Sequence, residues 1–135
     1  MHVIGLGHDM QAVSEVESCS GLLEPDAMFT GNELAMIGRN AEPARCMASL
    51  FSCKEAFFKA IPVQQGWHWC ELELGHDERG RPHFTYSGQL KKLMHAKHWT
   101  ACVSVSHSGH YVSSCVLIQQ AQHTQSANSS ALTDQ

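Results

Sequence analysis

Two acidic residues and one lysine have the types and spacing that a metal-dependent phosphate site requires. Asp9 follows the glycine-containing stretch "IGLGH", and the stretch "FSCKEAFFKA" at residues 51–60 holds Glu55 and Lys59. A hard cation such as Mg²⁺ prefers one or two carboxylates, and water and phosphate oxygens complete its coordination. An ammonium group beside such a cation neutralises phosphate charge. Together, the three side chains would suit a metal ion with a bound phosphate.

Each of these residues also has a plainer interpretation. Glu55 and Lys59 are four residues apart, so they share a helix face and could form a surface ion pair worth about 0.2–0.5 kcal/mol. Asp9 could cap a helix that begins at Met10. The aromatic and small residues around Glu55 weigh against a surface pair, because charged groups at the edge of a core need partners.

Histidine and cysteine are frequent, but they form no familiar metal motif. His107 stands at the expected end of a strand, where a turn presents it to solvent; it is either a turn histidine without a role or a donor to a phosphate. The chain has ten histidines and six cysteines, with neither an HExxH motif nor a CxxC pair. This pattern disfavours a zinc site and a disulfide framework and favours free thiols.

The spacing of hydrophobic residues and the positions of glycine and proline predict the helices and strands that position these residues. We expect a first buried strand that ends at Asp9, and its two glycines would allow a helix to approach closely. A helix over about 11–23 follows, and Thr30 and Glu33 form a capping box that opens a second helix. The third and longest helix is expected from about Pro43 to Ile61, with an apolar face of Met47, Leu50, Phe51, Ala56, Phe58 and Ile61.

The second half of the chain reads as strands with one short helix. We expect strands over 69–74 and 82–87, a helix capped by Ser87, and a hairpin of 101–107 with 111–119. The fold class predicted from this order is α+β, with a small mixed sheet packed with a long helix.

Length and composition favour one domain with its own core. The chain has 135 residues, of which 43% are hydrophobic, and we place the domain at 1–119 and a disordered polar tail at 120–135. No apolar run is long enough for a membrane span, and the first residues do not resemble a signal peptide, so a cytoplasmic location is expected. The net charge of −4 is uneven: residues 1–42 carry −6 and residues 43–97 carry +3. Such asymmetry can mark a surface that receives an anion.

Five stretches in order resemble the holo-[acyl-carrier-protein] synthase family of 4′-phosphopantetheinyl transferases. "IGLGHDM" is similar to the family's G-x-G-x-D strand, and "FSCKEAFFKA" to its F-x-x-KEA-x-x-KA helix. "FTGNEL", "ERGRPHFTYSG" and "VSVSHSGHYVSSCVL" resemble three further family stretches. The pairing of KEA-x-x-KA with the upstream glycines and aspartate is the specific part of the likeness.

The resemblance implies a reaction and a set of roles. The family transfers phosphopantetheine from coenzyme A to a serine of an acyl carrier protein or carrier domain, requires Mg²⁺ and releases 3′,5′-adenosine bisphosphate. Carried over, Asp9 and Glu55 would bind the metal, and Lys59 and His107 would contact phosphates of coenzyme A. Gly80, Arg81 and Pro82 would line the nucleotide site. The resemblance also implies a homotrimer with active sites between subunits, a place in fatty acid biosynthesis, and neither nucleic-acid nor membrane partners. The general base stays open between a metal-bound water and Glu55, with His107 less favoured.

One departure from the family affects the partner. Family members carry basic residues after the first strand, facing the acidic recognition helix of the carrier. Here that segment contains Glu15, Glu17, Glu24 and Asp26 and no lysine or arginine, and like charges would oppose docking. A less acidic carrier, or a carrier domain of a larger synthase, is one hypothesis. A non-catalytic coenzyme A or carrier-binding module on the same fold is the alternative function.

Overall fold

The computed structural model describes residues 1–122 and has an α+β architecture. Its elements follow the order β1 (His2–Ala12), α1 (Val13–Glu17), a 3-10 helix (Ser20–Leu23), α2 (Gly31–Arg39), α3 (Pro43–Ala60), a 3-10 helix (Trp69–Glu71), β2 (Leu72–His76), β3 (Pro82–Tyr86), α4 (Gly88–Lys97), β4 (Trp99–Ser108) and β5 (Tyr111–Gln120).

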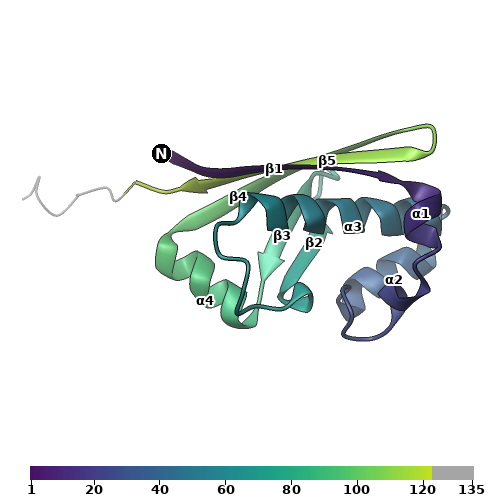
Figure 1. Ribbon diagram of the computed structural model, residues 1–135, viewed down its shortest axis with the longest axis horizontal. Helices are drawn as coiled ribbons and strands as arrows, with labels where there is room; N and C mark the ends of the chain where they lie inside the picture. The colour runs from purple at the N-terminus through teal and green to yellow at the C-terminus, as the bar shows by residue number, and fades with distance from the viewer. Residues whose placement is uncertain (123–135) are drawn as a thin grey trace, which may run out of the picture.

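The long helix α3 packs against one face of a three-stranded sheet. The strand order is β1-β5-β4, and both strand pairs are antiparallel. Figure 1 shows α3 running along the sheet, with α1 and α2 at one end of the molecule and α4 at the other. The site residues on β1 and α3 therefore face each other across a single strand–helix interface.

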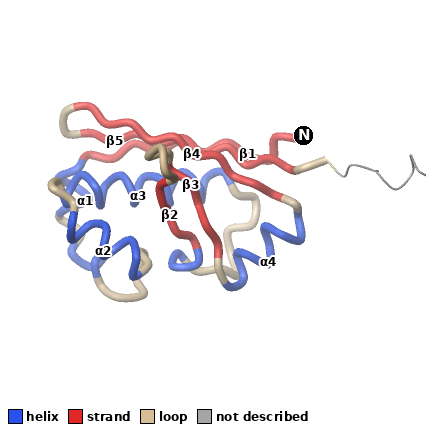
Figure 2. The backbone as a smooth tube through the Cα atoms, turned by 180° about the vertical axis from the view of Figure 1, so that it is seen from behind, coloured by secondary structure: helices blue, strands red, loops and turns tan. Residues whose placement is uncertain are grey.

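The strands β2 and β3 form a separate antiparallel hairpin. Figure 2 shows this hairpin on the same side of the larger sheet as α3, with α2 and α4 on either side of it. Phe84 of β3 is buried against Phe57 of α3, with ring centroids 5.3 Å apart. This packing joins the hairpin to α3 in one hydrophobic core.

Two glycines allow β1 to lie directly on α3. A Cβ atom at Gly5 would lie 1.8 Å from the carbonyl oxygen of Ala60, and one at Gly7 would lie 1.9 Å from the carbonyl oxygen of Ala56. Any larger residue would force the strand away from the helix. The expectation of a close approach is confirmed, and its consequence is that Asp9, two residues further on, faces α3.

The predicted class and its main features are confirmed, and several details differ. The capping box of Thr30 and Glu33, Pro43 in the first turn of the long helix and the late hairpin are all present. The strands form two antiparallel sheets among the described residues, not one mixed sheet. On the long helix, Phe57 is fully buried, whereas the predicted core residues Phe51 and Phe58 are half-buried.

The largest error concerns the segment around Asp9. The strand does not end there but continues to Ala12, and the helix that follows has only five residues, Val13–Glu17. Met10, Gln11 and Ala12 stay extended because they pair with Ser113, Val112 and Tyr111 of β5. Asp9 is therefore a strand residue, and the interpretation of Asp9 as a helix cap is wrong.

No helix within residues 1–122 is long and apolar enough to cross a membrane. Residues 123–135, which make up most of the predicted tail, lie outside the described part of the chain, and β5 itself extends to Gln120.

Candidate functional site

Asp9 is a buried carboxylate whose position is fixed on both sides. Its residue exposure is 4%. The Gln11 side chain donates from Nε2 to Oδ2 at 2.9 Å, and Lys59 donates from Nζ to Oδ1 at 3.1 Å. Behind it, the Ser52 hydroxyl lies 2.7 Å from the Ser114 hydroxyl and donates to the Asp9 carbonyl oxygen at 3.4 Å. These contacts hold the carboxylate in one place against α3.

Glu55 is the second carboxylate of the site. It lies on α3 and is half-buried. Burial raises the pKa of the Glu55 carboxyl above its ordinary value, and the negative charge of Asp9 raises it further, whereas Lys59 lowers it. The two carboxylates are thus close enough to repel each other.

Lys59 supplies the positive charge. It lies one helical turn after Glu55 and, in the described part of the chain, its ammonium pairs with Asp9 rather than with Glu55. It also donates to the carbonyl oxygen of His8 at 3.0 Å, and half of its side chain is exposed. An exposed ammonium next to buried oxygens has free donor capacity for a solvent-side anion.

These three residues could hold a divalent cation only in part. Two carboxylates face one ammonium, so the cluster carries excess negative charge, which a divalent cation would offset. Among residues 1–122, no group of three or more histidine, cysteine, aspartate or glutamate side chains is arranged to hold a metal ion. A cation held here would therefore need further oxygens from water or phosphate, as Mg²⁺ commonly does.

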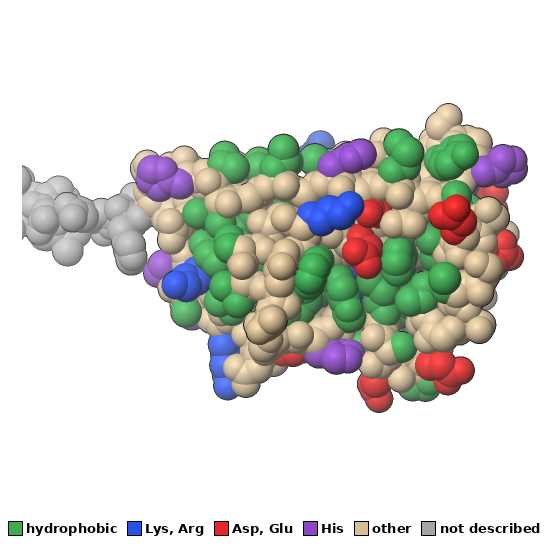
Figure 3. All heavy atoms as spheres, in the orientation of Figure 1, with side chains coloured by type: hydrophobic (Ala, Val, Ile, Leu, Met, Phe, Trp, Pro, Cys, Tyr) green, Lys and Arg blue, Asp and Glu red, His purple; other side chains and the backbone are tan. Residues whose placement is uncertain are grey.

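The site opens on the face of the molecule that carries α3. Figure 3 shows acidic and basic side chains next to each other near the edge of the sheet, with hydrophobic side chains around them. Half-buried Phe58, beside Lys59 in sequence, contacts Trp69 with ring centroids 5.4 Å apart. An aromatic surface thus borders the charged cluster.

His107 lies in a different part of the protomer. It is exposed near the end of β4, as expected, and lines a cavity of about 190 Å³ with Arg45, His76 and Leu50. Leu50 and Glu55 are five residues apart, so they point about 140° apart around α3. The side chains of Arg45, His76 and His107 bring N–H donors to this cavity, which could bind an anion, although Arg45 also pairs with Glu42.

The turn with Gly80, Arg81 and Pro82 connects β2 to β3 beside β4. Asp77 holds this turn, because its Oδ1 accepts from the backbone N–H groups of Arg79 at 2.8 Å and Arg81 at 2.9 Å. Gly80 has a φ of +77°, which favours glycine. Arg81 and Pro82 line a cavity of about 470 Å³ whose other wall is residues 101–105 of β4.

The structure therefore brings Asp9, Glu55 and Lys59 together and places His107 and the Arg81 turn elsewhere. Sequence analysis did not identify Gln11, which orients Asp9, or Arg45 and His76, which accompany His107. Gln11 is two residues from Asp9 and thus on the same face of a strand. This signal was hidden because the strand was expected to end at Asp9.

Comparison with known proteins gives consistent matches over most of the chain. Residues 5–116 match the family model described as the 4′-phosphopantetheinyl transferase superfamily. The chain is 28% identical over 123 residues to the holo-[acyl-carrier-protein] synthase of Myxococcus xanthus, covering 88% of this chain and 97% of that protein. It is also 28% identical over 127 residues to the enzyme of that name from Deinococcus radiodurans, covering 87% and 93%.

Solved structures share the fold. The holo-[acyl-carrier-protein] synthase of Neisseria meningitidis superposes with a TM-score of 0.79 at 22% identity, covering 87% of this chain and 99% of that one. A holo-(acyl-carrier-protein) synthase of Bacillus anthracis in complex with CoA (3′,5′-ADP) superposes with a TM-score of 0.72 at 21% identity, covering 90% and 100%.

Proposed function

The chain belongs to the holo-[acyl-carrier-protein] synthase family of 4′-phosphopantetheinyl transferases, and we propose that it transfers 4′-phosphopantetheine from coenzyme A to a serine of a carrier protein. In this reaction the serine hydroxyl oxygen bonds to the β-phosphorus of coenzyme A, the bond from that phosphorus to the bridging oxygen breaks, and 3′,5′-adenosine bisphosphate leaves. The serine proton passes to a base. The transfer would require Mg²⁺.

The observation that carries the proposal is the cluster of Asp9, Glu55 and Lys59. Phosphoryl transfer needs alignment and charge neutralisation more than covalent help from the protein. A buried carboxylate, a second carboxylate beside it and an exposed ammonium 3.1 Å from the first provide that combination. The same residues match the specific motif of the family.

We assign roles to the residues on this basis. Asp9 and Glu55 would hold Mg²⁺, which supplies Lewis-acid neutralisation of the pyrophosphate when bound. Lys59 would bind a pyrophosphate oxygen, and Gln11 would keep the Asp9 carboxylate in its orientation. Glu55 is also a candidate to accept the serine proton, because it is the half-buried carboxylate beside Lys59 in this cluster.

The nucleotide end of coenzyme A would occupy the cavity beside His107. His107, with Arg45 and His76 in the same cavity, would contact a phosphate, and Gly80, Arg81 and Pro82 would line the nucleotide site. The synthase of Bacillus anthracis, which shares this fold, was solved in complex with coenzyme A. That structure supports coenzyme A as the ligand of the fold.

The proposal includes a homotrimer with active sites between subunits. Two features of the protomer support a self-association surface. The outer face of β1 exposes Val3, Leu6 and Met10 at 65%, 65% and 60%, which is unusual for a face left in water. Glu55 and the cavity at His107 also lie on different sides of α3. A neighbouring subunit could therefore bring its own His107 cavity beside the Asp9 and Glu55 carboxylates.

A transfer assay tests the proposed function. Purified protein, coenzyme A, Mg²⁺ and a panel of apo carrier proteins are combined, and carrier mass is measured. We expect one carrier to gain one phosphopantetheine group in wild type and none to gain it in Asp9→Asn. A wild-type protein that binds coenzyme A tightly but modifies no carrier would support the non-catalytic binding module instead.

A further inference from the structure

The proposed reaction needs a docking surface for the carrier, and the charges of this chain favour the end of the molecule that carries α4. We infer that an acidic surface of the carrier docks on α4 and on the groove between α4 and the start of β4, and not on the segment after β1. The inference rests on the proposed function, because it names the surface that receives the partner of the same reaction.

Charge is distributed unevenly between the two ends of the molecule. Residues 87–122 contain three lysines and no acidic residue, and one carboxylate, that of Glu71, accepts from the N–H groups of Gln89 and Leu90 at the start of α4; residues 1–42 contain seven acidic residues and one arginine. On the face shown in Figure 3, acidic side chains gather at the end with α1 and α2, and basic side chains lie at the end with α4. An acidic partner would be steered toward α4 and repelled from the opposite end.

Within the described residues 1–122, the lysines of α4 form no ion pair. Lys91, Lys92 and Lys97 are exposed. The ion pairs within residues 1–122 are those of Arg45, Lys54 and Lys59. The ammonium groups of the three α4 lysines are therefore free to bind a partner. Leu90 and Met94 are buried beneath them and anchor the helix to the core.

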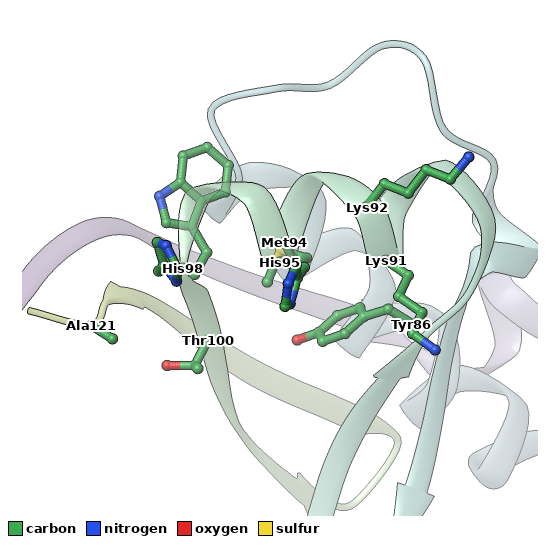
Figure 4. A pocket seen from close by; sticks show the side chains of 9 residues that line it. Tyr86, Lys91, Lys92, Met94, His95, His98, Thr100 and Ala121 are labelled. Carbon is green, nitrogen blue, oxygen red and sulfur yellow. The ribbon is translucent and has the colours of Figure 1, made fainter. Parts of the chain in front are cut away.

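The groove beside α4 has the shape and chemistry of a docking surface. A cavity of about 640 Å³ lies between α4 and β4, and Tyr86, Met94 and Trp99 provide apolar lining beside Lys91 and Lys92. Figure 4 shows Lys91 and His95 lying near the Tyr86 ring, whereas Lys92 extends away from the groove. An apolar centre with a charged rim is typical of a protein interface.

Tyr86 is a neutral part of this surface. Like any tyrosine it is uncharged at neutral pH, and burial raises the pKa of its hydroxyl further, to about 12. The groove therefore fits an acidic partner that inserts an apolar side chain.

The distance to the metal-site residues is compatible with one small carrier domain. Asp9 pairs with Ser114, which pairs with Val105, and the groove residue Thr100 lies five positions before Val105 on β4. Five strand residues span about 17 Å, and the two strand spacings from β1 to β4 add about 10 Å across the sheet, so the separation is about 20 Å. A domain of about 100 residues has a radius of gyration of about 13 Å. One carrier could thus contact α4 while its serine lies near Asp9 and Glu55.

Charge reversal at the two ends of the molecule tests the inference. The test variant is Lys91→Glu/Lys92→Glu, and the matched control at the other end is Glu15→Lys/Glu17→Lys, which changes the same number of exposed charges. An acidic apo carrier protein is the probe. Its KM in transfer and its Kd by calorimetry are measured in low salt and in about 0.5 M NaCl, with the KM for coenzyme A and the melting temperature as controls.

We expect the α4 variant to raise the carrier KM and Kd at least about tenfold in low salt, with less effect in high salt and an unchanged KM for coenzyme A. The control should change both constants less than threefold. The inference is overturned if the α4 variant binds the carrier as wild type does, or if the control tightens binding more than the α4 variant weakens it. Binding without any transfer in wild type would instead refute the proposed function.

Discussion

At the scale of single residues, Glu55 is a side chain whose charge is costly for the fold. Its raised pKa means that the folded protein holds the Glu55 proton more tightly than the unfolded chain does. The contribution of Glu55 to stability is therefore full below the ordinary glutamate pKa and is lost as pH rises through the raised pKa. At neutral pH, the Glu55 carboxylate therefore does not stabilise the fold, and its proposed role is functional.

Replacing Glu55 by Gln should separate function from stability. Without Mg²⁺, we expect Glu55→Gln to unfold at the same or a higher temperature than wild type at pH 8, because the unfavourable charge is gone. Transfer should fall by at least about a hundredfold, because a metal ligand is lost. Thermal unfolding from pH 4 to 8 and the transfer assay measure the two effects. A parallel loss of melting temperature and activity would contradict the metal-site role.

Lys54, beside Glu55, has the opposite character. It is fully buried, its Nζ lies 2.6 Å from Oε1 of the buried Glu33, and it donates to the carbonyl oxygens of Met28 and Trp69. Glu33 in turn accepts from the backbone N–H groups of Thr30 and Leu74. Burial lowers the pKa of the Lys54 ammonium, and Glu33 opposes that shift. The pair joins α2, α3 and β2.

We expect Lys54→Met to reduce the free energy of unfolding by about 3–5 kcal/mol, because it leaves the Glu33 carboxylate buried without its partner. Urea denaturation gives this value. Lys97→Met is the control, since Lys97 is exposed and takes part in none of the ion pairs within residues 1–122, and it should change the free energy of unfolding by about 0.5 kcal/mol or less. An equal loss of unfolding free energy in the two variants would show that the buried Lys54–Glu33 pair does not stabilise the fold.

The sequence predicted the residues that share a motif and missed those paired over long distances. Glu55 and Lys59 are recognisable because helix periodicity places them together, and Asp9 because glycines precede it. The partner of Lys54 is 21 residues upstream, where Glu33 was interpreted only as half of a capping box. No local spacing specifies which buried carboxylate meets which buried ammonium.

At the scale of elements, the contact between β1 and α3 determines the geometry of the site. Gly7 allows this contact, since its missing side chain leaves room for the carbonyl oxygen of Ala56. The length of β1 could not be predicted from local pattern, because Val13 and Val16 suggest helical spacing. Pairing of Gln11 and Ala12 with β5 outweighs that weak local preference.

Gly7→Ala should push β1 away from α3 and disturb the position of Asp9. We expect a loss of about 1–3 kcal/mol in unfolding free energy and a larger loss of transfer than that destabilisation explains. Gly38→Ala in α2 is the control, since nothing lies within 4 Å of its added Cβ, and it should stabilise the protein by up to about 1 kcal/mol. A Gly7→Ala variant with wild-type stability would argue against the close contact.

At the scale of the whole molecule, the exposed outer face of the three-stranded sheet is the feature that a protomer alone does not explain. Leu6 of β1 pairs with Leu117, which pairs with Cys102 of β4, so Cys102 lies on this face and is exposed in the protomer. A single sequence cannot reveal whether another subunit covers such a face. The strand pattern is the same for a face left in solvent and for one buried between subunits.

Thiol labelling tests whether subunits cover this face. In the native protein at pH 8, we expect Cys19 to be alkylated rapidly, because it is exposed away from the sheet. Cys53 should not react, since burial raises its pKa to about 12. Cys102 should be protected in the trimer and become reactive on dilution or in Leu6→Glu. Equally fast labelling of Cys102 and Cys19 in the assembled protein would exclude an interface on this face.

The central claim is that Asp9, Glu55 and Lys59 form a Mg²⁺-dependent transfer site. Its most direct test is the mass of an apo carrier protein after incubation with coenzyme A and either wild type, Asp9→Asn or Glu55→Gln, with and without Mg²⁺. The account predicts one added phosphopantetheine group, about 340 Da, only with wild type and Mg²⁺, because phosphoryl transfer depends on charge neutralisation at this cluster. Equal modification of the carrier by folded variants lacking either carboxylate would contradict it.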